Sequence, residues 1–127
     1  MKFYSRKLIK PENLNGNNTL FGGELLRWID EEAFIYAATR LKSSSVVTKF
    51  MSEINFINSA RQGEVIELGM ELSGVGRTSI SFRCLVRNLF TQKEIISIDK
   101  IVFVNLGEDE RPEPHGMTMD EINKPSN

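Results

Sequence analysis

Residues 24–41 read ELLRWIDEEAFIYAATRL, and no glycine or proline interrupts them. Apolar or small side chains recur in this stretch at steps of three and four residues, at Leu25, Ile29, Ala33, Tyr36 and Ala37. This spacing predicts an amphipathic helix that packs one face on a core. A helix of this length spans about 27 Å. One long helix is therefore expected to be the central element of the fold.

The sequence on either side of this helix predicts strands. Residues 2–10 alternate in character and predict an opening strand, whereas the Asn, Gly and Pro residues of PENLNGNNTLFGG predict a loop up to Gly23. After the helix, the period changes to two, which predicts strands at 46–57, 64–73, 77–90 and 94–105.

The faces of these strands indicate how they pack. Ile66, Leu68 and Met70 alternate with the acidic Glu67 and Glu71, so one sheet face is expected to be apolar and the other wet. The same alternation places Ile80, Phe82, Cys84 and Val86 on the apolar face. Because the connections between strands are short, neighbouring strands are expected to form antiparallel hairpins. The predicted class is α+β, with one helix laid along the apolar face of a curved antiparallel sheet.

Length and charge limit the possible functions. The 127 residues, of which 40% are hydrophobic, correspond to one domain, assigned here to residues 1–107. The acidic, proline-containing segment 108–127 is expected to be a flexible tail that adds nothing to the core. A net charge of −1 argues against a nucleic-acid partner. No apolar leader or membrane span is visible, so no membrane partner and a cytoplasmic location are expected.

The reactive side chains are few. Cys84 is the single cysteine, which excludes an internal disulfide and a thiolate metal site, and no metal is expected. Cys84 is expected to be a buried apolar residue. The single histidine, His115, lies in the predicted tail. Chemistry is therefore expected to use carboxylates, amides and backbone dipoles.

Asp30 has apolar helical neighbours, including Leu26, Phe34 and Ala37. Two interpretations are open. Asp30 either joins Glu31 and Glu32 in a solvated acidic patch, or lines a partly dry pocket in which a carboxylate is a better base or nucleophile.

Other candidates also have two interpretations. Gly22 and Gly23 form either a flexible helix start or an entrance where a ligand reaches the free N–H groups of the first turn. Asn15 is a turn former or orients a water or a carbonyl. Arg77, Thr78 and Ser79 follow a hairpin tip or contact a phosphate.

Two sets of apolar residues have no clear chemistry in the sequence. Trp28 and Phe34 sit at helical spacing and are expected to be packing residues. Phe34, Met51, Phe56 and Ile57 fit either the core or a channel for an acyl chain.

The order and spacing of several motifs resemble a known family over residues 5–106. The motifs are Asn15 with Phe21-Gly-Gly, Trp28-Ile-Asp30-Glu, Val46-Val-Thr48, Asn55-Phe56 and Gly76-Arg-Thr-Ser-Ile80. Together they resemble the hotdog-fold acyl-CoA thioesterases of the cytosolic acyl-CoA hydrolase type. One departure is Asn18, which stands where many relatives have glycine and is expected to tolerate the left-handed backbone region.

This resemblance implies a long helix wrapped by an antiparallel sheet, a homodimer as the minimal active unit, and hexamers built from dimers. It implies hydrolysis of acyl-coenzyme A to a carboxylic acid and coenzyme A, with no cofactor. Asp30 matches the catalytic carboxylate, Asn15 the catalytic asparagine and Gly23 the backbone donor, with support from Gly22. Arg77, Thr78 and Ser79 match the hairpin near the coenzyme A nucleotide.

The helix geometry adds a prediction about assembly. Asp30 lies seven residues beyond Gly23, which is about 10 Å along a helix axis. A thioester held at the helix start is therefore poorly placed for Asp30 of the same helix, and two antiparallel helices across a dimer axis are expected to share their sites. Two rival functions are an acyl-CoA-binding module without turnover, and a dehydratase on the same fold, which would need a histidine in the site.

Overall fold

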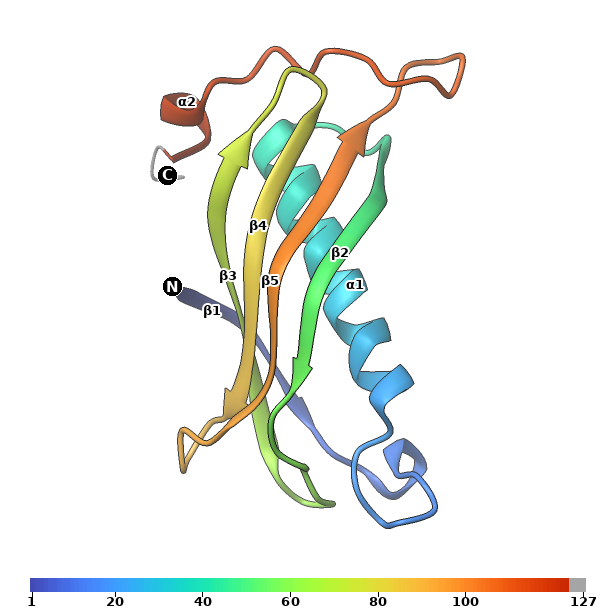
Figure 1. The fold of residues 1–127 in the computed structure, drawn as a ribbon, viewed down its shortest axis with the longest axis vertical. Helices are drawn as coiled ribbons and strands as arrows, with labels where there is room; N and C mark the ends of the chain where they lie inside the picture. The colour runs from blue at the N-terminus through green and yellow to red at the C-terminus, as the bar shows by residue number, and fades with distance from the viewer. Residues whose placement is uncertain (124–127) are drawn as a thin grey trace.

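The computed structural model describes residues 1–123 (Figure 1). The first elements along the chain are strand β1 (Lys2–Leu8), the short 3-10 helix η1 (Pro11–Asn13) and the long helix α1 (Gly22–Leu41). They are followed by strands β2 (Val46–Phe56), β3 (Val65–Val75), β4 (Ser79–Asn88) and β5 (Glu94–Asn105), and by the short helix α2 (Met119–Asn123). The predicted strands and the predicted long helix are all confirmed.

Helix α1 lies along one face of the sheet (Figure 1). All five apolar positions predicted to face the core are buried. The helix begins at Gly22, two residues earlier than predicted, because the first N–H groups of a helix need no intrahelical acceptor and glycine is tolerated there. Tyr36 connects the helix to the sheet, with its ring centroid 4.8 Å from that of Phe82 on β4.

The five strands form one antiparallel sheet in the order β1-β3-β4-β5-β2. The hairpins β3–β4 and β4–β5 are as predicted. The predicted hairpin between β2 and β3 is wrong, because β2 pairs only with β5 and β3 lies between β1 and β4. Residues 57–64 instead cross the end of the sheet, where Ala60 is buried and its carbonyl accepts a hydrogen bond from the Leu20 N–H at 2.7 Å. A short connection alone therefore does not determine which strands pair.

The alternation of the strands is confirmed on β4, where Ile80, Phe82, Cys84 and Val86 are all buried. The expectation of a uniformly wet opposite face is wrong at Glu67, which is 5% exposed. Its carboxylate accepts a hydrogen bond at 2.7 Å from Nε of Arg87, whose guanidinium lies over the Phe3 ring of β1. The ion pair and the covering side chain compensate for the loss of water around Glu67.

The segment after β5 packs along the end of the sheet. Asn105 receives a hydrogen bond from the Glu113 N–H on its carbonyl and donates to the Glu113 carbonyl through Nδ2. The expectation that nothing after Gly107 adds to the core is wrong, because Ile122 of α2 is 5% exposed and joins the core cluster. The flexibility expected of residues 108–127 stays a prediction.

Candidate active site

The start of α1 presents unsatisfied backbone donors. The residue before the helix, Phe21, has an extended backbone, and its side chain accepts no capping hydrogen bond from the first N–H groups of the helix. A Cβ at Gly23 would lie 2.7 Å from Cε1 of Phe21, and one at Gly22 would lie 3.3 Å from Cε1 of Phe56. Glycine is therefore needed at Gly23 for the ring of Phe21 to lie across the helix start, and both aromatic rings border an electropositive backbone end.

Asn15 shapes the loop that leads into this helix. Its Oδ1 accepts hydrogen bonds from the N–H groups of Asn17 at 2.9 Å and Thr19 at 3.1 Å, and its Nδ2 lies 3.0 Å from the Thr19 hydroxyl. The turn interpretation is thus confirmed. Asn18 has a φ of 60°, so the expected tolerance of the left-handed region is also confirmed. Because Oδ1 is occupied, the second hydrogen on Nδ2 is the group that Asn15 can offer to a ligand.

Asp30 lies on the side of α1 that faces β2. Its Oδ1 accepts a hydrogen bond from the Thr48 hydroxyl at 2.6 Å, a length typical of an O–H donor to an ionised carboxylate. This bond holds the carboxylate toward the strand and away from Glu31, which pairs with Arg27. Asp30 is exposed within one protomer.

Asp30 and Thr48 border an open apolar hollow of about 690 Å³ between α1 and β2. Phe34, Ile35 and Val47 line it, together with Phe103 from the core. The exposed apolar surface continues along the free edge of the sheet at Phe50, Ile54 and Phe56. These three side chains, and the first three of the hollow, are each between 37% and 60% exposed. Within one protomer, the expectation that Phe34 packs in the core is wrong, whereas Trp28 is buried as expected. Of the acyl-channel candidates, only Met51 packs against the core.

The hairpin carrying Arg77, Thr78 and Ser79 lies at the other end of the sheet from the start of α1 (Figure 1). Its backbone carbonyls are bound by later segments. Asn105 N–H donates to Thr78 at 2.8 Å, and His115 N–H donates to Arg77 at 3.2 Å. Within one protomer the candidate residues therefore lie in three separate places. These are the start of α1 with Asn15, the middle of α1 with Asp30, and the distant hairpin.

The remaining reactive side chains lie elsewhere. Burial raises the pKa of the Cys84 thiol to about 12, and the side chain is 2% exposed, which confirms the expectation of a buried apolar residue. His115 uses both ring nitrogens in the tail, with Nε2 3.0 Å from the Ser79 carbonyl oxygen and Nδ1 accepting from the Met117 N–H. Within residues 1–123 there is no group of three or more side chains suited to hold a metal ion. No helix in that part of the chain has the length and apolar character needed to span a membrane.

Thr48 is a candidate site residue that the sequence analysis did not single out by itself. It lies in the Val46-Val-Thr48 motif, but its hydrogen bond to Asp30 joins residues 18 positions apart on different elements. No local pattern marks such a contact. The phenyl ring of Phe56 beside Gly22 is a second contact of this kind.

Comparison with known proteins finds that the sequence of this chain is similar to those of thioesterases. The model of the thioesterase superfamily matches residues 17–93. An uncharacterized acyl-CoA thioester hydrolase of Bacillus subtilis is 30% identical over 107 residues, which cover 82% of this chain and 62% of that protein. A second uncharacterized acyl-CoA thioester hydrolase, from Zymomonas mobilis, is 33% identical over 84% of this chain and 73% of its own length. The chain thus spans less than two-thirds of the Bacillus relative.

Solved structures have the same architecture. An apo-hexameric acyl-CoA thioesterase is 30% identical, with a TM-score of 0.76 over 92% of this chain and 79% of that one. A hexameric broad-specificity acyl-coenzyme A thioesterase has a TM-score of 0.83 over 95% of this chain and 91% of that one, at 21% identity. The second likeness concerns the fold alone. Together with the observed sheet and helix, it confirms the predicted hotdog fold.

Proposed function

Because this chain belongs to the thioesterase superfamily, we propose that it hydrolyses the thioester of acyl-coenzyme A to a carboxylic acid and coenzyme A. The observation that carries the proposal is a pair of complementary groups on one helix. The uncapped N–H groups of Gly22 and Gly23 suit a developing oxyanion, and the Asp30 carboxylate, held by Thr48, suits a base or nucleophile.

The assembly follows from the separation of these groups. Gly23 and Asp30 are about 10 Å apart along one helix axis, so we propose that each site takes its helix start and Asn15 from one protomer and Asp30 from the other. The free edge of β2 and its exposed apolar residues provide a surface for a two-fold axis. An antiparallel pairing of this kind also brings the Arg77–Ser79 hairpin of one protomer to the end of the sheet where the partner's helix begins.

In the proposed reaction, the thioester carbonyl oxygen accepts hydrogen bonds from the N–H groups at the helix start. Removing one such donor from an oxyanion site costs about 3 to 4 kcal/mol in other enzymes. Asp30 either takes a proton from a water that attacks the carbonyl carbon, or attacks that carbon itself to give a mixed anhydride that water then hydrolyses. The C–S bond breaks and the electron pair leaves with the coenzyme A sulfur as a thiolate. Asn15 positions the carbonyl or the water through Nδ2, and Arg77, Thr78 and Ser79 contact the coenzyme A nucleotide.

No cofactor or metal takes part in this scheme, since the coenzyme A belongs to the substrate. The cytoplasmic location expected from the sequence stays a prediction. We further propose a hexamer built from three dimers, because solved acyl-CoA thioesterases of similar fold are hexameric. The dehydratase alternative gains no support, since both ring nitrogens of His115 are occupied in the tail.

The activity is tested by steady-state hydrolysis of a panel of acyl-CoA chain lengths with a free-thiol readout. Asp30→Asn is expected to lower kcat at least ~100-fold, whereas Asp99→Asn, which changes an exposed carboxylate on β5, is expected to leave it unchanged. Acyl-CoA binding without turnover by the wild type would instead favour the non-catalytic binding module. Near-normal turnover by Asp30→Asn would refute the role of that carboxylate.

Site sharing has its own test. If Asp30 and Asn15 of different protomers meet in one site, a mixture of Asp30→Asn and Asn15→Ala chains recovers about a quarter of wild-type activity, because half of the dimers contain one intact site. Sites confined to one protomer would give no recovery. Light scattering on Phe50→Lys, a change on the exposed β2 edge, is expected to show weaker dimerisation at unchanged secondary structure.

A further inference from the structure

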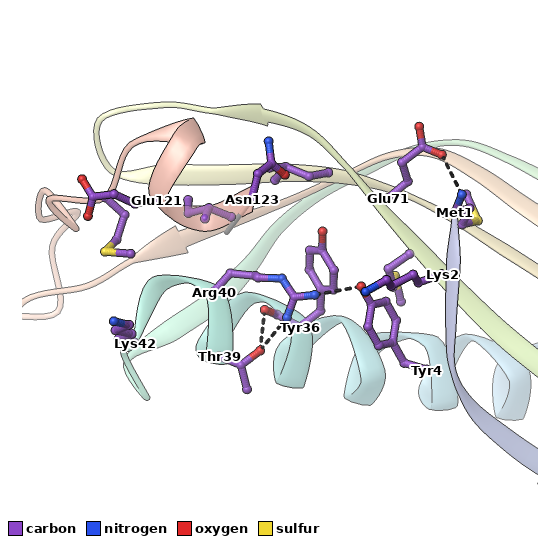
Figure 2. Close-up of a pocket in the computed structure, with 14 residues that line it drawn as sticks. Met1, Lys2, Tyr4, Tyr36, Thr39, Arg40, Lys42, Glu71, Glu121 and Asn123 are labelled. Atoms are coloured by element: carbon purple, nitrogen blue, oxygen red, sulfur yellow. Dashed lines mark hydrogen bonds and ion pairs between the residues drawn. The ribbon is translucent and has the colours of Figure 1, made fainter. Parts of the chain in front are cut away.

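A second cavity, of about 680 Å³, lies apart from every residue assigned to the thioester site. It is enclosed by the C-terminal half of α1, the beginning of β1, the middle of β3 and the helix α2 (Figure 2). None of Asp30, Asn15, Gly23 or the Arg77–Ser79 hairpin lines it.

Arg40 of α1 is the cation inside this cavity. Its Cζ lies 4.3 Å from the ring centroid of Tyr36 and 5.4 Å from that of Tyr4. One terminal nitrogen donates to the Tyr4 hydroxyl at 2.8 Å, and the other donates to Thr39 Oγ1 at 3.3 Å. These contacts hold the guanidinium in one orientation, and they leave further N–H donors of its planar fork for a ligand.

No carboxylate of the described chain neutralises Arg40. The ion pairs formed within residues 1–123 involve other residues. Glu71 and Glu121 border the cavity, but both are exposed, and Glu121 accepts a hydrogen bond from the Thr118 hydroxyl. Lys2 and Lys42 add positive charge at the border. Within residues 1–123 the cavity thus holds a positioned cation that forms no ion pair.

Tyr36 adds a hydroxyl donor next to Arg40. Figure 2 shows its phenol directed from α1 toward the space below β3, on the same side of the helix as the guanidinium. Burial raises the pKa of this hydroxyl, an effect that the Arg40 charge opposes. The phenol therefore keeps its proton at neutral pH and is able to donate it in a hydrogen bond.

Side chains from β3 and from the segment after β5 give the cavity wall an apolar part, beside the charged and polar residues at its border. Met70 and Leu72 come from β3, and Met117 and Ile122 come from the segment after β5. A ligand that fits both parts has a planar anionic group, which the guanidinium fork and the phenol bind, and an apolar body, which contacts the methionines and aliphatic side chains. A carboxylate meets the first requirement, because its two oxygens match the two parallel donors of an arginine.

We propose that this cavity is a second ligand site, which binds a carboxylate carrying an apolar chain between Arg40 and the apolar wall formed by β3 and α2. The site goes beyond the proposed hydrolysis and does not depend on it, since no residue is shared between the two places. Binding is measured without turnover, so a failure of this proposal is distinguishable from a failure of the proposed activity.

The probe is octanoate, titrated into the purified full chain by calorimetry, with octan-1-ol as the uncharged probe of the same chain length. Octanoate is expected to bind the wild type at one site per protomer. Arg40→Gln is expected to weaken octanoate binding at least ~10-fold, because a hydrogen-bonded charge pair is lost, and octan-1-ol is expected to bind more weakly by a similar factor. Arg40→Lys, which keeps the charge and the stem but loses the fork, is expected to bind with an intermediate affinity.

Two control variants separate this site from other binding. Lys93→Gln removes an exposed cation from the β4–β5 turn at the opposite end of the sheet, and it is expected to bind octanoate as the wild type does (Figure 1). Asp30→Asn is also expected to bind octanoate normally, which places the ligand away from the thioester site. Thermal unfolding shows that each variant is folded. The proposal is overturned if the wild type does not bind octanoate, or if it binds octan-1-ol as tightly as octanoate. It is also overturned if both Arg40 variants bind octanoate as tightly as the wild type does, or if Asp30→Asn no longer binds octanoate.

Discussion

Asn15→Asp separates the loop-building hydrogen bonds of Asn15 from the catalytic task that we propose for the same side chain. The substitution keeps the acceptor oxygen that binds the N–H groups of Asn17 and Thr19, and it removes the amide donor that the proposed mechanism uses. Asn15→Ala removes both. The pair of variants therefore distinguishes a residue that only builds the loop from one that also takes part in the reaction.

The expected magnitudes follow from the hydrogen bonds. Asn15→Ala loses two backbone-to-side-chain bonds, each contributing about 0.5 to 1.5 kcal/mol, so the free energy of unfolding should fall by about 1 to 3 kcal/mol. Asn15→Asp keeps both, and the Thr19 hydroxyl, 3.2 Å from Oδ1, donates to it, so the loss should stay below about 1 kcal/mol. Both variants lack the amide donor, and kcat should fall about 100- to 1000-fold if that donor stabilises the oxyanion.

The assay combines acyl-CoA hydrolysis with chemical unfolding at one fixed protomer concentration. Asn17→Asp is the matched control, because it introduces the same carboxylate two residues away, where the loop uses the backbone N–H and not the side chain. The reasoning is refuted in its catalytic part if Asn15→Asp turns over substrate within about threefold of the control. It is refuted in its structural part if Asn15→Asp is destabilised as strongly as Asn15→Ala.

Three further predictions concern other contacts. Thr48→Val removes the hydroxyl that binds Asp30 and should lower kcat about 10-fold with little change in the unfolding midpoint; an unchanged kcat would show that Asp30 needs no such support. Arg87→Met leaves Glu67 buried without its cation and should lower the free energy of unfolding, measured in urea, by about 3 kcal/mol. This value is at the lower end of what the loss of a buried ion pair costs, because the Arg87 side chain is 30% exposed. An added Glu67→Gln change should recover part of the loss. Because burial raises the pKa of Cys84 to about 12 in the folded chain, from 9.0, only the unfolded chain releases the thiol proton between these pH values. Stability should therefore decline from about pH 9 to 12 more steeply in the wild type than in Cys84→Ala, and parallel curves would contradict the assignment.

The elements of this fold could be predicted from the sequence because their signals are local. The 3.6-residue period of 24–41 and the two-residue period of the later segments each report which side chains face a core, and the structure places the elements within about two residues of those bounds. The local sequence also showed that a glycine pair lies at the start of this helix and that Asp30 lies further along it. A residue's position on its own helix is a property of the nearby sequence.

Only the tertiary structure decided how these elements meet. Connection length favoured a hairpin of β2 with β3, whereas the observed pairing of β2 with β5 depends on packing across the whole sheet. The contact from Thr48 to Asp30, the pairing of Arg87 with Glu67, and the cavity around Arg40 each join segments that are far apart in the chain. Such contacts depend on three-dimensional proximity, which no periodicity encodes. The sequence therefore marked the Asp30 carboxylate on its helix, while its hydrogen bond to Thr48 came only from the tertiary structure.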